Sequence, residues 1–553
     1  MPSGSAKNNK VERAMKKIQI YDTSLRDGTQ SEDISLTNDD KIKIALKLDE
    51  LGIDFIEGGW PGSNPVDMAF FNEIKRTSLK HAKIAAFGST HHPGFTAEND
   101  PNLRNLLSSG SDVCTIFGKT WDIHATEALR IPLEQNLKII HDSVAFLNSM
   151  GRDVVFDAEH FFDGFKANQE YALAAITAAH KAGAQTLSLC DTNGGTLPHE
   201  VYRIVQTITE ALPDAQLGIH AHNDCELAVA NSIAAVQAGA THIQGTINGI
   251  GERCGNANLC SIIPTLELKF NDEYSTLGKD KLALLTSTSA FVTDVANVMP
   301  FDRQPFVGRS AFAHKGGVHA SAVNRNSALY EHIDPEIVGN RQRVLLTELA
   351  GRANIVNMAK KFGFHLDKDE PVVKGLLNEL KKRSSMGYDY AAAEASVELL
   401  LLKKLGRRGV REFFKLNQFR VLELKEAQDL DPISEASVIV EVEGVTEHTA
   451  ATGRGPVNSL DNALRKALCN FYPRLSEMKL LDFKVRVMTA ETPGGGGTAS
   501  FVRVLIESGD HLSRWVTVGV SYNIIEASWQ AVADSITYKL YKDEHEQRAQ
   551  IEQ

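Results

Sequence analysis

The segment Gln216-Leu-Gly-Ile-His-Ala-His-Asn-Asp224 places two histidines directly after an apolar run. Alternate side chains of a β-strand point to the same side, so His220 and His222 are expected to face one way. Both would stand at the carboxyl end of the strand, where parallel α/β folds carry their functional side chains. The pair therefore predicts two ligands of a metal site, with two structurally satisfied histidines as the alternative.

Length and composition indicate a globular protein with more than one domain. The chain has 553 residues, of which 42% are hydrophobic and 23% are charged. A formal net charge of −11 without a basic stripe argues against nucleic acid or an acidic membrane surface as a partner and favours small metabolites. Six cysteines without a Cys-x-x-Cys pair predict a reducing, cytoplasmic location.

The chain is expected to divide into four parts. Residues 1–17 are polar and basic and lack the apolar core of a secretion signal, so a disordered tail is expected, with a short organelle-targeting peptide as the alternative. No stretch is long and apolar enough to span a membrane. A catalytic domain at 18–280, helical linker subdomains at 281–423 and a C-terminal domain at 424–553 follow. The charged segment Leu424–Asp431 is predicted to be a linker.

From residue 18 onward, short apolar runs alternate with amphipathic stretches, which is typical of βα units and a parallel sheet. Three helical patterns end in glycine just before the next strand, at Gly52, Gly183 and Gly239. Eight strands in roughly 250 residues favour a closed (β/α)8 barrel, a TIM barrel, over an open sheet. The expected strands are Ile18–Asp22, Asp54–Glu57, Ile84–Phe87, Asp112–Ile116, Val154–Asp157, Thr186–Leu189, Leu217–His220 and His242–Gly245.

A polar or ionisable side chain follows almost every expected strand. Because the carboxyl ends of the strands meet at one mouth of such a barrel, these side chains are expected to converge there. A solvated rim would also be polar, but its polarity would be less regular. The set consists of Arg26, Asp27, Glu57, Ser89, Thr90, Lys119, Glu159, His160, Asp191, Thr192, His220, His222 and Asn248.

Three ordered segments carry a family signature: Asp22-Thr-Ser-Leu-Arg-Asp-Gly-Thr-Gln30, His220-Ala-His-Asn-Asp224 and Gly245-Thr-Ile-Asn-Gly-Ile-Gly-Glu-Arg-Cys-Gly-Asn256. They closely resemble the family of 2-isopropylmalate, homocitrate and citramalate synthases, and the resemblance continues to the C-terminus. It implies an acyltransferase that condenses acetyl-CoA with a 2-oxo acid and hydrolyses the thioester. The stretches 57–64, 117–122 and 157–163 look most like the citramalate synthase branch, which implies pyruvate as the acceptor and a place in isoleucine biosynthesis.

The resemblance implies a ligand set for a divalent cation: Asp27, His220, His222 and the amide oxygen of Asn256. Such a cation would polarise the acceptor ketone and hold the negative charge that develops on its oxygen. Mixed oxygen and nitrogen ligands suit Mg, Mn, Zn or Co without distinguishing among them. Two histidines and a carboxylate also describe a ferrous oxygenase, so the class depends on the surrounding motifs.

By the same resemblance, Arg26 binds the substrate and stabilises charge on the reacting oxygens, with a plain ion pair to Asp27 as the alternative. Glu159 is expected to hold the catalytic water or a base partner, unless it is only a rim carboxylate. Thr192 is expected to bind the carboxylate of the oxo acid, with a simple turn residue as the alternative.

A histidine beyond the barrel completes the predicted catalytic set. His319 ends the sequence Gly316-Gly-Val-His319, and the matching family histidine reaches a barrel mouth from a helical subdomain, usually that of the partner protomer. The resemblance implies that His319 is the general base for the acetyl methyl group, or part of a relay with Tyr330. A surface histidine without a role is the alternative.

Beyond Leu424, strands followed by one helix are expected twice. This part resembles the family's regulatory domain, which implies a homodimer and isoleucine as the effector. Its tract Gly494–Gly497 lacks the Lys-Ser/Thr of a phosphate loop and is expected to form a hairpin or a turn against a ligand.

Three alternatives remain on this scaffold. A 2-isopropylmalate synthase would need a wider acceptor pocket and would respond to leucine. A lyase for a 3-hydroxyacyl-CoA would leave the C-terminal domain without a purpose. A catalytically silent amino acid sensor is disfavoured because Arg26, the predicted metal ligands and their motifs are intact.

Overall fold

The computed structural model describes residues 15–551, except 64, 271, 315–318, 320, 321, 324, 345–351, 362, 391, 392, 407–410, 489–499, 511 and 512. The chain forms two compact units. The first unit comprises Met1–Phe312 and Ile333–Gln342, and the second comprises Ala313–His332 and Arg343–Gln553. In the part of the chain that is described, no helix has the length and apolar character needed to cross a bilayer.

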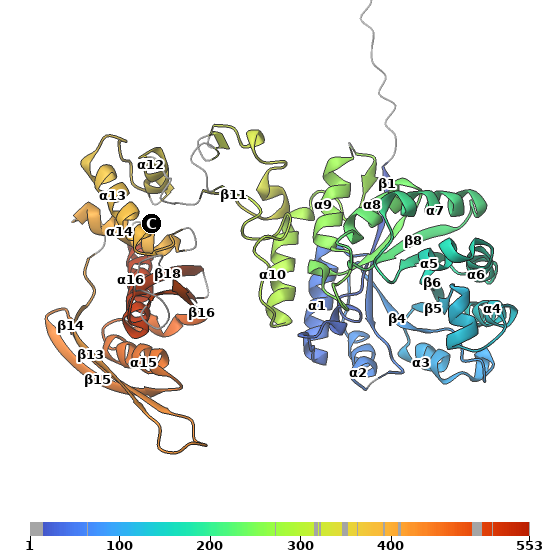
Figure 1. Ribbon diagram of the computed structural model, residues 1–553, viewed down its shortest axis with the longest axis horizontal. Helices are drawn as coiled ribbons and strands as arrows, with labels where there is room; N and C mark the ends of the chain where they lie inside the picture. The colour runs from blue at the N-terminus through green and yellow to red at the C-terminus, as the bar shows by residue number, and fades with distance from the viewer. Residues whose placement is uncertain are drawn as a thin grey trace, which may run out of the picture. The chain divides into compact units, whose positions relative to one another are not determined.

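The first unit contains a closed barrel of eight parallel strands in chain order, which confirms the predicted (β/α)8 fold (Figure 1). The last strand pairs with the first, with Asp22 opposite Gly245. Every predicted strand is present within a few residues of its expected bounds. The strands are β2 (Gln19–Asp22), β3 (Phe55–Gly59), β4 (Lys83–Ser89), β5 (Val113–Lys119), β6 (Asp153–Glu159), β7 (Thr186–Asp191), β8 (Gln216–Ala221) and β9 (His242–Gly245).

Helices surround these strands (Figure 1). Local signals set their ends: the Thr37 hydroxyl accepts from the backbone N–H of Asp40, whose carboxylate accepts from the backbone of Thr37. The same helix ends at Gly52, where a φ of 98° favours glycine. The helices are α1 (Asn38–Leu51), α2 (Pro65–Ile74), α3 (Pro101–Ser109), α4 (Leu133–Ser149), α5 (Phe161–Ala167), α6 (Gln169–Lys181), α7 (Pro198–Ala211), α8 (Ala228–Gln237), α9 (Leu259–Lys269) and α10 (Leu285–Val295).

The apolar core of the first unit lies mainly between the strands and the helices. Ile56, Phe156 and Ile219 on the strands are fully buried against helical residues such as Phe70. Inside the barrel, the apolar packing is a small separate cluster around Tyr21. The remaining inward positions carry buried polar side chains, which must find partners because an unpaired polar group in the interior is costly.

Most of the predicted N-terminal tail, residues 1–14, lies outside the described residues. Its last two residues form β1 (Lys16–Lys17), which pairs in parallel with β10 (Tyr274–Ser275). In the second unit, β11 (Ala313–His314) pairs with β12 (Arg343–Val344), again in parallel.

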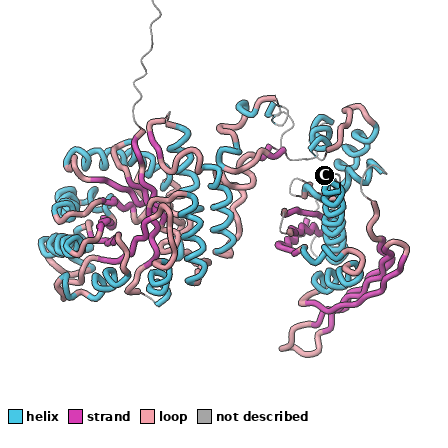
Figure 2. Tube along the Cα trace, turned by 180° about the vertical axis from the view of Figure 1, so that it is seen from behind, coloured by secondary structure: helices cyan, strands magenta, loops and turns pink. Residues whose placement is uncertain are grey.

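In its described residues, the second unit has three α-helices that precede two antiparallel sheets, and each of these sheets carries one further helix. The helices are α12 (Arg352–Lys361), α13 (Pro371–Ser385) and α14 (Glu394–Leu405). One sheet has β13 (Lys415–Leu424), β14 (Ile433–Val442) and β15 (Val445–Gly453), and the other has β16 (Lys479–Met488), β17 (Phe501–Gly509) and β18 (Arg514–Ser521). Helix α15 (Pro456–Leu468) packs on the first sheet and α16 (Ile524–Ile551) on the second (Figure 2). Three strands and one helix therefore occur twice, as expected.

One boundary differs from the sequence prediction. The charged segment Leu424–Asp431 joins β13 to β14 within one sheet, with Leu424 opposite Ile433, and is not an inter-domain linker. Charged side chains suit the solvated end of a hairpin as well as a linker, so composition alone could not distinguish the two. The tract Gly494–Gly497 lies outside the described residues.

Candidate active site and metal centre

Three predicted metal ligands meet at the mouth of the barrel. Asp27 follows β2, His220 lies in β8, and His222 comes just after that strand. The Oδ2 atom of Asp27 lies 3.4 Å from Nε2 of His220 and 3.9 Å from Nε2 of His222. The two Nε2 atoms are 3.3 Å apart, and all three side chains are buried. Atoms with lone pairs this close repel one another unless a proton or a cation lies between them.

Asn256 is the fourth candidate ligand, and it lies next to His222. Its backbone forms an isolated antiparallel bridge with His222, which places the two residues side by side. Asn256 is 1% exposed, yet its Oδ1 atom has no hydrogen-bond partner among the described residues, and the same is true of Oδ1 of Asp27. Buried oxygens without partners are costly, and a bound cation would satisfy both. The four side chains therefore fit a divalent metal.

The pKa values of Asp27, His220 and His222 are shifted by burial and by neighbouring charges. Burial alone would raise the pKa of Asp27, but the charge of Arg26 and the hydrogen bond from His220 outweigh it and hold the pKa well below its usual range. Burial on its own would lower the pKa of His220, but the hydrogen bond and the charge of Asp27 outweigh burial and raise that pKa above its ordinary value. For His222, burial and the charge of His220 lower the pKa to about 4. A cation would thus replace a proton on His220, so we expect acid to weaken metal binding.

Arg26 is held by more than its neighbour Asp27. Its Nε atom donates to Oε2 of Glu57 at 2.6 Å, and its guanidinium lies 3.8 Å from the ring centroid of Phe87. Glu57 is fully buried and also accepts from the hydroxyl of Tyr21 at 2.9 Å. The separation between Arg26 Nη1 and Asp27 Oδ2 is 3.3 Å. The guanidinium is therefore fixed in orientation, with Glu57 as its principal partner.

Glu159 and Thr192 stand at the ends of neighbouring strands, β6 and β7. Glu159 forms an ion pair with Lys119, and both side chains are about a quarter exposed. The hydroxyl of Thr192 accepts from the backbone N–H of His160 at 2.9 Å, so its own hydrogen stays available for a ligand. Its carbonyl accepts from Arg253 at 2.7 Å, which gives this residue a structural role as well.

The loop that carries Asn256 is anchored through Asn248, which adopts a positive φ of 66°. The amide nitrogen of Asn248 donates to the carbonyl of Ser289 and to the hydroxyl of Thr293, both at 2.9 Å on α10. Its oxygen accepts from Gln304 at 3.0 Å. The helix after the barrel therefore helps to position the last candidate ligand, a structural role that the strand-end pattern did not indicate.

His319 and Tyr330 belong to the second unit, whereas the candidate metal ligands belong to the first. The two rings stack with centroids 4.2 Å apart. Residues 315–318, which include the predicted glycine pair, lie outside the described residues. The structure thus brings the rings of His319 and Tyr330 together as a stack, and their role in a relay stays a prediction.

Sequence reasoning missed two buried residues inside the barrel, Gln244 in β9 and Asp157 in β6. Gln244 Oε1 lies 2.8 Å from Nδ1 of His220, and the Gln244 amide nitrogen donates to Asp157 at 2.8 Å. The available signal was a polar residue in the middle of an apolar strand, which demands an interior partner. The identity of that partner depends on which strands face one another across the barrel.

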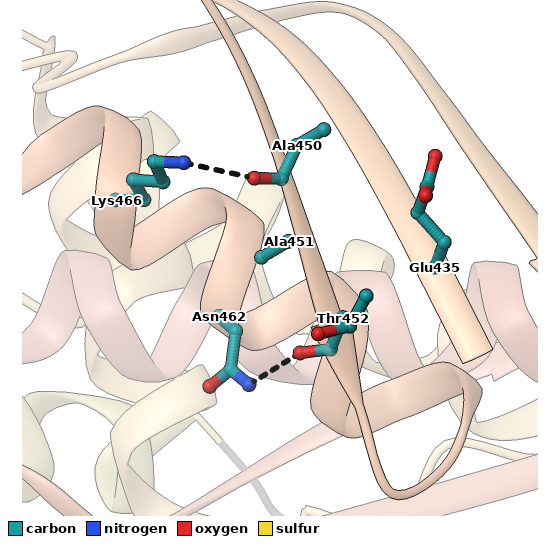
Figure 3. Close-up of a pocket in the computed structure, with 6 residues that line it drawn as sticks. All are labelled: Glu435, Ala450, Ala451, Thr452, Asn462 and Lys466. Carbon is teal, nitrogen blue, oxygen red and sulfur yellow. Dashed lines mark hydrogen bonds between the residues drawn. The ribbon is translucent and has the colours of Figure 1, made fainter. Parts of the chain in front are cut away.

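The second unit has an open hollow of about 440 Å³ between α15 and the β13–β15 sheet (Figure 3). Lys466 on α15 donates to the carbonyl of Ala450 at 3.2 Å, and Asn462 donates to that of Thr452 at 3.0 Å. Glu435 lines the hollow from β14. The hollow therefore has one cationic and one anionic side chain on its wall.

Comparison with known proteins identifies the family. A profile described as HMGL-like matches residues 17–287, one for a homocitrate synthase post-HMGL domain matches 306–387, and one for the LeuA allosteric (dimerisation) domain matches 391–540. The (R)-citramalate synthase of Geobacter sulfurreducens is 56% identical, over 96% of this chain and 99% of that protein. The (R)-citramalate synthase of Aquifex aeolicus is 52% identical over the same shares.

The chain belongs to the (R)-citramalate synthase family. It is therefore an acyltransferase, and the predicted branch is confirmed. The 2-isopropylmalate synthase of Methanocaldococcus jannaschii is 30% identical over 96% of both chains, so the main alternative synthase is a more distant relative.

Removal of one imidazole should weaken metal binding in this member of the citramalate synthase family. We expect His222→Ala to lower metal affinity about tenfold or more, because one ligand of the buried cluster is lost. Metal content after dialysis, measured by mass spectrometry, checks this. His91→Ala, which removes a histidine outside the cluster, should retain the metal. Full metal content and full turnover in His222→Ala would contradict the proposed ligand set.

Proposed function

We propose that the mouth of the barrel condenses acetyl-CoA with pyruvate and that water then releases CoA from the thioester, which yields citramalate. The observation that carries this proposal is the buried cluster of Asp27, His220, His222 and Asn256 beside a fixed Arg26. Family membership supplies the reaction, and the cluster supplies a place where the charge of an oxo acid can be held. The proposal includes a divalent cation, with no preference among Mg, Mn, Zn and Co.

In this proposal, Asp27, His220, His222 and Asn256 hold the cation, which when bound polarises the ketone and stabilises negative charge on its oxygen. Arg26 is oriented by Glu57 and Phe87. Its planar guanidinium donates hydrogen bonds to the ketone oxygen and stabilises the charge that develops there. The free hydroxyl hydrogen of Thr192 binds the carboxylate of the acceptor.

The remaining steps are proton transfers. We assign His319 as the base that removes a proton from the acetyl methyl group, with Tyr330 stacked on it as its relay partner. Glu159, paired with Lys119, holds the water that attacks the thioester. The proposed base belongs to a different unit from the metal ligands.

A panel of 2-oxo acids tests the proposed acceptor. With CoA release as the readout, kcat/KM should be highest for pyruvate and roughly 10–200-fold lower for 2-oxoisovalerate, because a closely fitted pocket discriminates by size. Phe87 lies against the Arg26 guanidinium and stacks on Phe117 with ring centroids 5.5 Å apart, so we assign these two rings to the wall of the acceptor pocket. A preference for 2-oxoisovalerate would favour 2-isopropylmalate synthase, and no turnover with any acid would favour a silent sensor.

The assignment of His319 predicts a selective loss of turnover. We expect His319→Asn to lower kcat by roughly two to four orders of magnitude, because a positioned base contributes about that much. Steady-state kinetics should show a nearly unchanged KM for pyruvate. His314→Asn is the matched control on the neighbouring strand, where His314 instead bonds to Glu331 at 2.9 Å. A His319→Asn variant with normal kcat and poor pyruvate binding would move this residue from catalysis to binding.

We also propose a homodimer that is inhibited by isoleucine at the C-terminal unit. The match to a LeuA allosteric (dimerisation) domain supports this. Apolar side chains such as Leu422 and Val487, 56% and 57% exposed on the two sheets, offer surface for a second copy. Glu435 and Lys466 across the hollow have the charges that pair with the ammonium and carboxylate of an amino acid.

Isoleucine should inhibit the full-length enzyme, and hydrogen exchange should then slow within residues 391–540. Inhibition at a separate site implies a coupling of about 1–3 kcal/mol, so pyruvate should weaken isoleucine binding by the same factor. Calorimetry with and without pyruvate measures that reciprocity, and leucine is the control ligand. Truncation at Leu424 is unsuitable because it would divide the β13–β14 sheet. Slowed exchange confined to the barrel mouth, or indifference to both amino acids, would contradict the assignment.

A further inference from the structure

Two side chains extend the candidate metal centre into the barrel. Gln244 and Asp157 are 0% and 4% exposed, and neither has a role in the function proposed above. Gln244 pairs with His220 in the register of β8 with β9, so the two side chains are neighbours on the inner face. Their hydrogen bonds form a line from His220 through Gln244 to Asp157, with both heavy-atom distances at 2.8 Å.

The polarity of this line is determined by chemistry. Burial raises the pKa of Asp157 to about 7. In its ionised form the carboxylate accepts from the NH2 end of the Gln244 amide, which lies 2.8 Å from it. The amide oxygen then faces His220 and can only accept. Nδ1 of His220 therefore carries a proton, so Nε2, which faces Asp27 at 3.4 Å, is the nitrogen whose lone pair becomes available when a cation replaces its proton.

The second candidate histidine has no such support. Nδ1 of His222 is buried and has no hydrogen-bond partner among the described residues. Gln244 thus fixes the tautomer and the ring orientation of His220, whereas no described side chain holds Nδ1 of His222.

We propose that Gln244, held by Asp157, is a positioning residue that presents Nε2 of His220 to a divalent cation. This inference rests on the proposed metal centre and deepens it. Hydrogen bonds of this kind align a ligand imidazole and raise its basicity, and their loss typically weakens metal binding about 10–100-fold. Gln244 itself touches neither the cation nor the substrate; it acts through His220.

Metal-free full-length protein, titrated with Mn²⁺ in a calorimeter, tests the proposal. Gln244→Met keeps the length of the side chain and removes both hydrogen bonds, so the Kd should rise about 10–100-fold. Combining Gln244→Glu with Asp157→Asn reverses the polarity of the pair and retains the hydrogen bonds. This double variant should bind Mn²⁺ within about threefold of the wild type, because the residue at 244 still accepts from His220.

A structural role would instead appear in stability, so thermal melting of each metal-free sample is the second readout. Asn136→Leu is the matched control, since it also removes a buried amide, which bonds to Lys119 and Tyr171. It should lower the melting temperature and leave the Kd for Mn²⁺ unchanged. Gln244→Met should change the Kd by far more than its melting temperature explains.

Two results would overturn the proposal: a wild-type Kd in Gln244→Met, or a double variant that binds as weakly as Gln244→Met. If Gln244→Met does not fold, Asp157→Ala replaces it, because loss of the carboxylate frees the amide to turn its NH2 end toward His220. Its Kd should rise about tenfold, and an unchanged value would overturn the proposal. An error in the metal centre itself would give a different result from an error in the role of Gln244. Wild-type protein would then bind no Mn²⁺, and His222→Ala would not change that result.

Discussion

The contact between the Asp27 carboxylate and two imidazoles is the interaction on which the candidate site depends. These groups are buried and lie within 4.8 Å of one another, so each would be costly without compensation. Arg26 compensates for the charge of Asp27 from one side, and Gln244 holds His220 from the other. The interior of the barrel is therefore polar because every group near the cluster needs a partner.

The need for hydrogen-bond partners explains why so many strands contribute polar side chains to the interior of the barrel. Tyr21 on β2 bonds to Glu57 on β3, which orients Arg26 after β2. Across the barrel, Asp157 on β6 and Gln244 on β9 orient His220 on β8. A closed barrel is the arrangement that brings such distant strand ends together without long loops. Substitution at one interior position should thus change the orientation of Arg26 or His220 at the mouth.

The division into two units bears on the proposed inhibition by an amino acid. His319 and Tyr330 belong to the same unit as the two C-terminal sheets, and the metal ligands belong to the other. An amino acid bound at the second unit, as proposed above, would therefore bind in the unit that carries the candidate base and apart from the metal ligands.

The sequence by itself determined the barrel, its eight strands and the strand-end residues Asp27, His220 and His222, because these depend on local periodicity and on residues placed just after strands. Asn256 was expected only from the family resemblance. His220 and His222 are two residues apart, so any strand there sets them on one side. Gln244 and Asp157 could not be assigned in this way, since their partner, His220, lies on another strand and the contact exists only once the barrel closes. The tertiary structure also decided that Leu424–Asp431 is a hairpin, because only pairing of β13 with β14 distinguishes a solvated turn from a linker.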